Sequence, residues 1–172
     1  NIFLLGLCAC MVIMGRMADL YGRRLILYIG MLGFGLTSLG VGLSSNIPLL
    51  LSFRLGQGIF TAILYTATGA IVSNAFDKKD RGKAMGILFG VNGIGLAIGP
   101  VLGGIIVGAL SWRWVFLVNV PLIILSFIIC IPNVRESKSQ EKGMRIDWWG
   151  LLFLSIGLSS LVFALVNGYS WG

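Results

Sequence analysis

Residues 84–112 read AMGILFGVNGIGLAIGPVLGGIIVGALSW and carry no charged side chain. The run is long enough to cross a bilayer as one helix, because about twenty apolar residues suffice. It is nevertheless rich in glycine and contains Pro100, residue types that an isolated helix tolerates poorly. Since small residues let the backbones of membrane helices approach one another, we expect a closely packed membrane-spanning helix here.

The composition of the whole chain is that of a membrane protein. Of its 172 residues, 57% are hydrophobic and only 11% are charged, and the mean hydropathy is +0.96. Soluble domains carry about 25% charged residues. The three cysteines lie in apolar runs without metal-like spacing, so we interpret them as small hydrophobic residues and expect neither a disulfide framework nor a metal site. We therefore predict an all-α, polytopic membrane helix bundle.

Uncharged stretches and one turn, residues 44–48, divide the chain into six predicted spans. Their approximate limits are 1–15, 25–44, 49–73, 84–109, 114–132 and 148–168. The first is too short to cross a bilayer and lacks the features of a signal peptide. We interpret it as the remainder of a longer span.

The basic residues predict the orientation of these spans. Loops 16–24, 77–83 and 133–147 lie on one side and hold every Lys and Arg except Arg54 and Arg113. By the positive-inside rule these loops are cytoplasmic, in a multi-pass protein of the cell (inner) membrane. The net charge of +7 is then explained by solvated loops that face anionic lipid, and we expect no nucleic-acid partner.

Arg54 lies inside the span 49–73, where a charged side chain is costly. One interpretation is that the side chain reaches the outer interface. The other is that it faces water or protein, because polar residues recur at helical spacing on its helix: Arg54, Gln57, Thr61, Tyr65 and Thr68. Our candidates for the lining of a substrate cavity are Gln57, Thr61, Tyr65 and Asn92, each of which could alternatively serve as an interhelical hydrogen-bonding residue.

Two further stretches stand out. Residues 15–24 follow the pattern G-x-x-A-D-x-x-G-R-R, in which glycines permit a tight reversal and Asp19 either pairs with Arg23 or caps the following helix. Within residues 84–112, a second pattern gives the helix two smooth faces that permit sliding, or simply close packing without a role in transport. It comprises Gly86, Gly95, Gly99, Pro100, Gly103 and Gly104.

These stretches resemble signatures of the major facilitator superfamily. Residues 15–24 resemble its cytoplasmic loop signature, R-x-x-Q-G at Arg54 a second signature, and the glycine–proline pattern the antiporter motif of the fifth span. SWRWVFLVNVP (111–121) and IDWWG (146–150) resemble the EmrB/QacA-type drug:proton antiporters, which have fourteen spans. The resemblance implies a proton-coupling role for Arg54 and a cytoplasmic gate that stabilises the outward-open state, formed by Gly15, Asp19, Gly22, Arg23 and Arg24.

The resemblance also implies an incomplete facilitator fold, mostly its N-terminal half. Residues 1–132 would be spans two to six of the N-terminal six-helix bundle, 133–147 a cytoplasmic loop, and 148–172 an additional central span, the seventh. The implied function is export of hydrophobic or cationic drugs in exchange for protons by alternating access, without a cofactor. The partners would be a small-molecule substrate, protons, the lipid bilayer and the remainder of the same chain.

The acidic residues place a limit on this mechanism. All six lie in or beside the predicted cytoplasmic loops, so we expect the proton-carrying group in the remainder of the chain. The alternatives are a symporter for a sugar or metabolite, and a non-transporting membrane receptor or assembly protein. We do not expect an enzyme, because the sequence shows no nucleophile–base pair, metal cluster or phosphate-binding loop.

Overall fold

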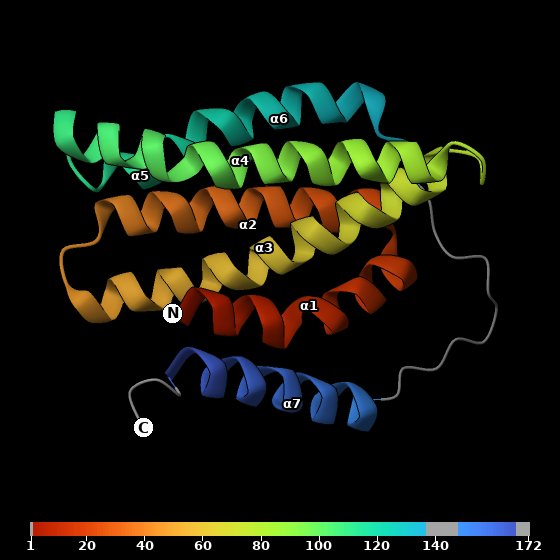
Figure 1. Ribbon diagram of the computed structural model, residues 1–172, viewed down its shortest axis with the longest axis horizontal. Coiled ribbons are helices and arrows are strands. Elements are labelled where there is room, and N and C mark those ends of the chain that lie inside the picture. The colour runs from red at the N-terminus through yellow and green to blue at the C-terminus, as the bar shows by residue number, and fades with distance from the viewer. Residues whose placement is uncertain (1, 137–147, 168–172) are drawn as a thin grey trace.

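The computed structural model describes residues 2–136 and 148–167, which form helices joined by short turns and contain no strand (Figure 1). The helices are α1 (Ile2–Tyr21), α2 (Arg23–Leu43), α3 (Ile47–Ala75), α4 (Arg81–Ala109), α5 (Trp114–Leu117), α6 (Asn119–Asn133) and α7 (Trp148–Asn167). The predicted all-α class is confirmed.

In the described part of the chain, five helical segments are long and apolar enough to cross a membrane, and α5 and α6 together count as one of them. Within the described residues, Trp149–Leu165 of α7 is a shorter apolar helix. The successive helices run in alternating directions, so the turns collect at two ends of the bundle (Figure 1). The end that holds the junction of α1 and α2, the turn between α3 and α4 and the end of α6 is called the basic end below.

The predicted boundary between the first span and the first loop was wrong. Helix α1 has 20 residues and continues through Tyr21, so residues 16–21 are helical and not part of a loop. Gly22 alone separates α1 from α2, with a φ of 112° that favours glycine. Its N–H donates to the carbonyl of Ala18 and its carbonyl accepts from Ile26, so the two helices share this residue.

Two further boundaries differ slightly from the prediction, namely the turn before α3 and the first residue of α4. Asn46 caps α3 by accepting a hydrogen bond from the Leu49 N–H (2.9 Å), and Pro48 follows in the first turn, where a missing N–H costs nothing. The turn is therefore confined to residues 44–46. Helix α4 begins at Arg81, which shortens the predicted loop 77–83.

The predicted span 114–132 is divided into α5 and α6 at Val118. Pro121 explains the break, because a proline ring clashes with the carbonyl four residues earlier, here that of Leu117, and cannot donate a hydrogen bond to it. Helix α6 then continues to Asn133. The remainder of loop 133–147 after Glu136, with Lys138, Lys142 and Arg145, and the last predicted span residue, 168, lie outside the described residues.

Helices α2 and α3 pack in an antiparallel arrangement that depends on glycines. A Cβ at Gly33 would collide with the Phe60 ring, and one at Gly40 would lie 2.6 Å from the Phe53 ring. Gly30 lies opposite Ile63, and Gly56 opposite Thr37. In each of these pairs the two residue numbers add to 93, so the helices keep one register throughout the contact.

Helices α1 and α3 run parallel and approach even more closely. A Cβ at Gly6 would lie 2.8 Å from the carbonyl oxygen of Leu55, and one at Gly58 would collide with the carbonyl oxygen of Phe3. The core is therefore formed by α1, α2 and α3, with α7 packed on α1. In contrast, α4 packs against α3 and α5 without a single buried residue.

Candidate functional site

Arg54 lies near the start of α3, half-buried, at the end of the bundle opposite the basic end. Its guanidinium donates from Nη1 to Oε1 of Gln57 (3.2 Å), one helical turn further along α3. It also lies over two aromatic rings, those of Phe3 (5.5 Å to the centroid) and Phe116 (4.7 Å). Arg54 thus faces protein groups from α1 and α5, an environment that differs from that of a side chain extended into lipid.

Gln57 connects Arg54 to a buried polar network. Its Nε2 donates to Oγ of Ser38 on α2 (2.5 Å), which also accepts from Nδ2 of Asn119 at the start of α6 (3.3 Å). Gln57 and Ser38 are 2% and 0% exposed. Since buried polar groups are stable only when hydrogen-bonded, the network fixes the amide of Gln57 with its oxygen toward Arg54.

A pocket of about 310 Å³ lies between α3 and α4, with a contribution from α2. Beside this pocket, the hydroxyl of Tyr65 donates a hydrogen bond to Oδ1 of Asn92 (2.9 Å). This hydrogen bond joins α3 to α4. Thr61 also lines the pocket, but its hydroxyl bonds to its own helix at the carbonyl of Gln57. The lining residues are Phe34, Thr61, Leu64, Tyr65, Thr68, Gly69, Leu88, Phe89 and Asn92.

The structure therefore divides the four predicted cavity residues between two places. Thr61, Tyr65 and Asn92 come together at the pocket, whereas Gln57 is buried against Ser38 and does not line it. This pocket is concave, mostly apolar and carries a few polar groups, which is the usual character of a binding site for small organic molecules.

The basic end contains the predicted gate residues. Arg23 donates to Oδ1 of Asp19 from Nε (3.1 Å) and Nη2 (2.7 Å), so Asp19 forms the ion pair and not the helix cap. Gly15, predicted to permit a reversal, lies inside α1, where it packs against Thr66 of α3. The reversal itself takes place at Gly22.

Arg24 joins the start of α2 to the end of α6. It donates from Nη2 to the carbonyl of Ile131 (3.0 Å) and from Nε to the hydroxyl of Tyr28 (2.9 Å), and its backbone N–H donates to Oε1 of Glu136 (3.2 Å). Tyr28 in turn donates to the carbonyl of Cys130 (3.3 Å). A cation at these carbonyls is favoured, because the last turn of a helix carries partial negative charge.

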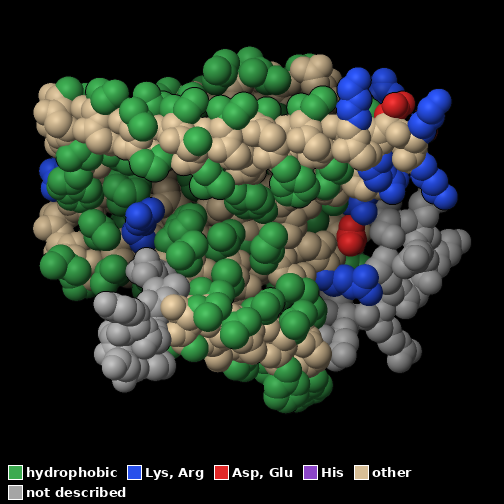
Figure 2. All heavy atoms as spheres, viewed as in Figure 1, with side chains coloured by type: hydrophobic (Ala, Val, Ile, Leu, Met, Phe, Trp, Pro, Cys, Tyr) green, Lys and Arg blue, Asp and Glu red, His purple; other side chains and the backbone are tan. Residues whose placement is uncertain are grey.

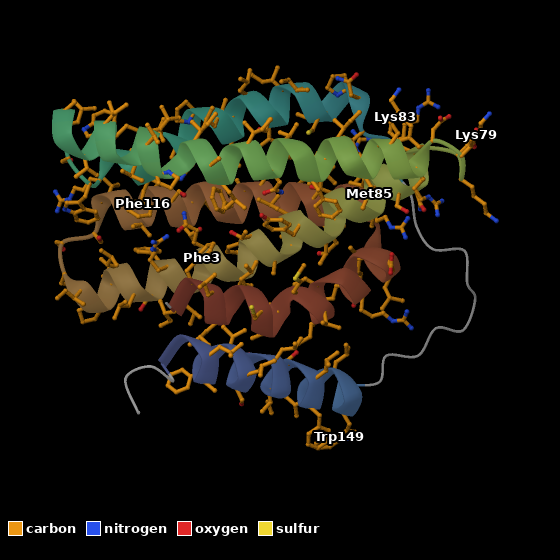
Figure 3. The ribbon with its side chains drawn as sticks, viewed as in Figure 1. Phe3, Lys79, Lys83, Met85, Phe116 and Trp149 are labelled. Carbon is orange, nitrogen blue, oxygen red and sulfur yellow. The ribbon has the colours of Figure 1, made fainter. Side chains whose placement is uncertain are left out.

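Figure 2 shows that the visible basic side chains gather mainly at the basic end, while hydrophobic side chains cover the middle of the bundle. The described basic residues at that end are Arg16, Arg23, Arg24, Lys78, Lys79, Arg81, Lys83 and Arg135. Figure 3 labels Lys79 and Lys83 there, far from Phe3 and Phe116 in the view.

The predicted antiporter-motif residues all lie on α4, which is continuous through Pro100. At its glycines, Gly86, Gly95, Gly99, Gly103 and Gly104, an added Cβ would have no neighbour within 4 Å among the described residues. The two smooth faces of this helix are therefore open in the described part of the chain.

Sequence reasoning missed several residues of this arrangement. Ser38 and Asn119 are polar residues within apolar runs, a signal that could have marked them, although their pairing with Gln57 required the fold. Phe3 and Phe116 gave no signal, because phenylalanine is ordinary in a membrane span. The role of Tyr28 also depends on the position of α6.

Fold and site together define a multi-pass membrane protein with a half-buried arginine in its helix bundle and a mostly apolar pocket between α3 and α4. The family model that matches residues 1–171 is that of the Major Facilitator Superfamily. This chain belongs to the major facilitator superfamily.

Several curated relatives are resistance or export proteins. Over 172 residues the chain is 34% identical to "Multidrug resistance protein 3" of Bacillus subtilis (strain 168), covering 98% of this chain and 33% of the relative. It is 29% identical to "Tetracenomycin C resistance and export protein" of Streptomyces glaucescens (100% and 32% covered), and 38% identical to "Puromycin resistance protein pur8" of Streptomyces alboniger (92% and 32%). The chain spans about a third of the length of these relatives.

Proposed function

We propose that this chain is part of a secondary active transporter that exports hydrophobic or cationic small molecules in exchange for protons by alternating access. The observation that carries the proposal is Arg54, a guanidinium held inside the bundle by Gln57 and two aromatic rings. A charged side chain within a membrane-spanning segment is costly, so a structural purpose alone accounts for it poorly.

Arg54 would act as a fixed positive charge. Arginine does not deprotonate at any working pH, so it cannot itself carry the proton. A nearby positive charge lowers the pKa of a carboxyl group and repels both a proton and a cationic substrate. The described carboxylates, Asp19, Asp77, Asp80 and Glu136, lie at the basic end, which favours a proton carrier in the remainder of the chain.

The pocket between α3 and α4 supports the substrate class. Apolar side chains such as Phe34, Leu88 and Phe89 would contact a hydrophobic compound, while Thr61, Tyr65 and Asn92 would orient it. The names of the relatives support the same substrate class, since they describe multidrug resistance and resistance to tetracenomycin C and puromycin.

The basic end would face the cytoplasm, with the chain in the cell membrane. There, Asp19, Arg23 and Arg24 would act as a gate in the outward-open state, because Arg24 holds the ends of α2 and α6 together. The open glycine faces of α4 would receive helices from the remainder of the chain and slide against them.

The proton-coupling role is tested in the intact transporter, reconstituted in proteoliposomes with a pH-sensitive dye. We expect drug-driven proton release to fall by about tenfold or more in Arg54→Ala, because a shift of one unit in the carrier's pKa changes its proton affinity about tenfold. Arg54→Lys keeps the charge and should retain part of the release.

The matched control is Lys79→Ala. Lys79 lies in the turn between α3 and α4 at the basic end, far from Phe3 and Phe116 in Figure 3. Lys79→Ala removes one positive charge without changing the surroundings of Arg54, so this variant should retain proton release. Undiminished release in Arg54→Ala would contradict the coupling role.

The substrate pocket is tested by cysteine labelling in a background without Cys8, Cys10 and Cys130. We expect Thr61→Cys and Tyr65→Cys to react with a water-soluble maleimide and to be protected by excess drug. Thr66→Cys, which packs against Gly15, should stay unreactive. If drug leaves the rate at both pocket positions unchanged, the pocket is not the substrate site.

A further inference from the structure

The contacts of Arg54 leave its charge uncancelled within the described part of the chain. Its partners there are a neutral amide oxygen, that of Gln57, and two aromatic rings. No ion pair to Arg54 is found among residues 2–136 and 148–167. Along α3, Ala75 at the basic end is about 30 Å away, at about 1.5 Å per residue.

The two rings come from helices other than α3. Phe3 lies on the first turn of α1 and Phe116 on the four-residue helix α5, and Figure 3 shows both labels at the same end of the bundle. An aromatic ring attracts a cation through the negative charge of its face, yet it carries no net charge. Rings therefore stabilise a guanidinium and leave its net charge unchanged. A carboxylate, in contrast, would neutralise that charge.

We propose that Phe3 and Phe116 are positioning residues that hold the Arg54 guanidinium at its place while leaving its full positive charge to act on groups in the transport pathway. The effect of these rings on transport rests on the proposed function. The contact between the rings and the Arg54 guanidinium rests on the geometry alone.

Helix α5 is held so that Phe116 stays at this position. Leu117 packs on Gly42 of α2, where an added Cβ would lie 2.6 Å from the Leu117 side chain. Arg113, just before α5, donates to the carbonyl of Ser44 (3.0 Å). Helix α5, which carries Phe116, is thus fixed against α2.

The charged groups near Arg54 are few. Arg113 is the other described cation at this end, and it is directed to Ser44. On the helices that contact Arg54 or its network, the other described charged residues lie toward the basic end; they are Arg16, Asp19, Arg23 and Arg24. A change in the ring at position 116 would therefore act mainly on Arg54.

The test replaces Phe116 with phenylalanines that carry one, two and three fluorine atoms on the ring, in the intact transporter. Fluorine changes ring size little but weakens the negative face stepwise. We expect a stepwise fall in Tm and a parallel stepwise fall in drug-driven proton release. The same series at Phe3 should give a smaller fall, because that ring lies farther from the guanidinium.

Phe60 provides the matched control. It lies on the same helix as Arg54 and packs its ring against Gly33, and within the described part of the chain the ring contacts neither a cation nor another aromatic ring. A fall at Phe116 with a flat series at Phe60 supports the proposal. A flat series at Phe116, or equal falls at both positions, overturns it.

The two readouts separate this inference from the proposed function, since Tm is measured without drug or a proton gradient. If the unmodified protein shows no drug-driven proton release, the antiport proposal fails, while a stepwise fall in Tm still supports the contact. If that protein exchanges drug for protons and the Tm series at Phe116 is flat, the positioning role alone fails.

Discussion

At the scale of single residues, close helix packing depends on positions where no side chain fits. At Gly58 an added Cβ would meet the carbonyl oxygen of Phe3, and at Gly6 one would meet the carbonyl oxygen of Leu55. The neighbours are backbone atoms, which cannot turn aside as a flexible side chain can. Substitution there must push α1 and α3 apart.

We therefore predict that Gly58→Ala lowers the free energy of unfolding by about 1–3 kcal/mol, the usual cost of overpacking. Gly69 lies on the same helix, and a Cβ there would have no neighbour within 4 Å. Gly69→Ala should change the free energy of unfolding by less than about 1 kcal/mol, which is the difference in helix propensity between alanine and glycine. Thermal unfolding of the purified protein measures both. Equal effects would show that the α1–α3 contact does not limit stability.

The element whose environment differs most from the rest is α4. It has no buried residue, and its glycines face open space in the described part of the chain, whereas the glycines of α2 receive side chains from α3, α5 and α6. Glycine is a poor helix former, so a face of glycines that merely met lipid would weaken the helix without a gain. This contrast favours a partner for α4 in the remainder of the chain.

For α4 we predict that Gly99→Leu abolishes drug export while leaving a folded protein in the membrane, because the added side chain would block the approach of a partner helix. Val101→Leu, an exposed position on the same helix, should export normally. Export assays and the amount of protein in membranes give the two readouts. Normal export with leucine at Gly95, Gly99 and Gly103 would mean that this face meets lipid.

At the scale of the whole molecule, the distribution of charge predicts orientation. In a background without Cys8, Cys10 and Cys130, we expect Ser45→Cys to react with an impermeant maleimide in intact cells. Lys79→Cys, in the turn at the basic end, should react only after the membrane is opened. The reverse pattern would place the basic end outside and would exclude export through a cytoplasmic gate of Arg23 and Arg24.

Much of this architecture could be predicted from the sequence, because apolar runs mark membrane helices directly. The exception at residues 16–21 has a physical reason: charged residues such as Arg16 and Asp19 mark where the apolar stretch ends, not where helical hydrogen bonding ends. That limit depends on the positive φ of Gly22, which the charge pattern does not reveal.

The candidate site could be predicted only in part. Arg54 and Gln57 are one turn apart, so their contact follows from helix geometry. Gln57 and Tyr65 are eight residues apart, which rotates them by about 80° around the helix. Gln57 consequently meets α2 and Tyr65 meets α4. The contacts of Phe3 and Phe116 depend on tertiary packing and leave no trace in local spacing.

The constant register between α2 and α3 also limits how the protein can move. A shift of one residue would drive the Phe60 and Phe53 rings out of the recesses at Gly33 and Gly40 and into neighbouring backbone. The two helices would therefore move together as one rigid unit. Under the alternating-access function proposed above, any rocking of this unit would carry the Arg54 charge with it and would change the electric field along the proposed transport pathway.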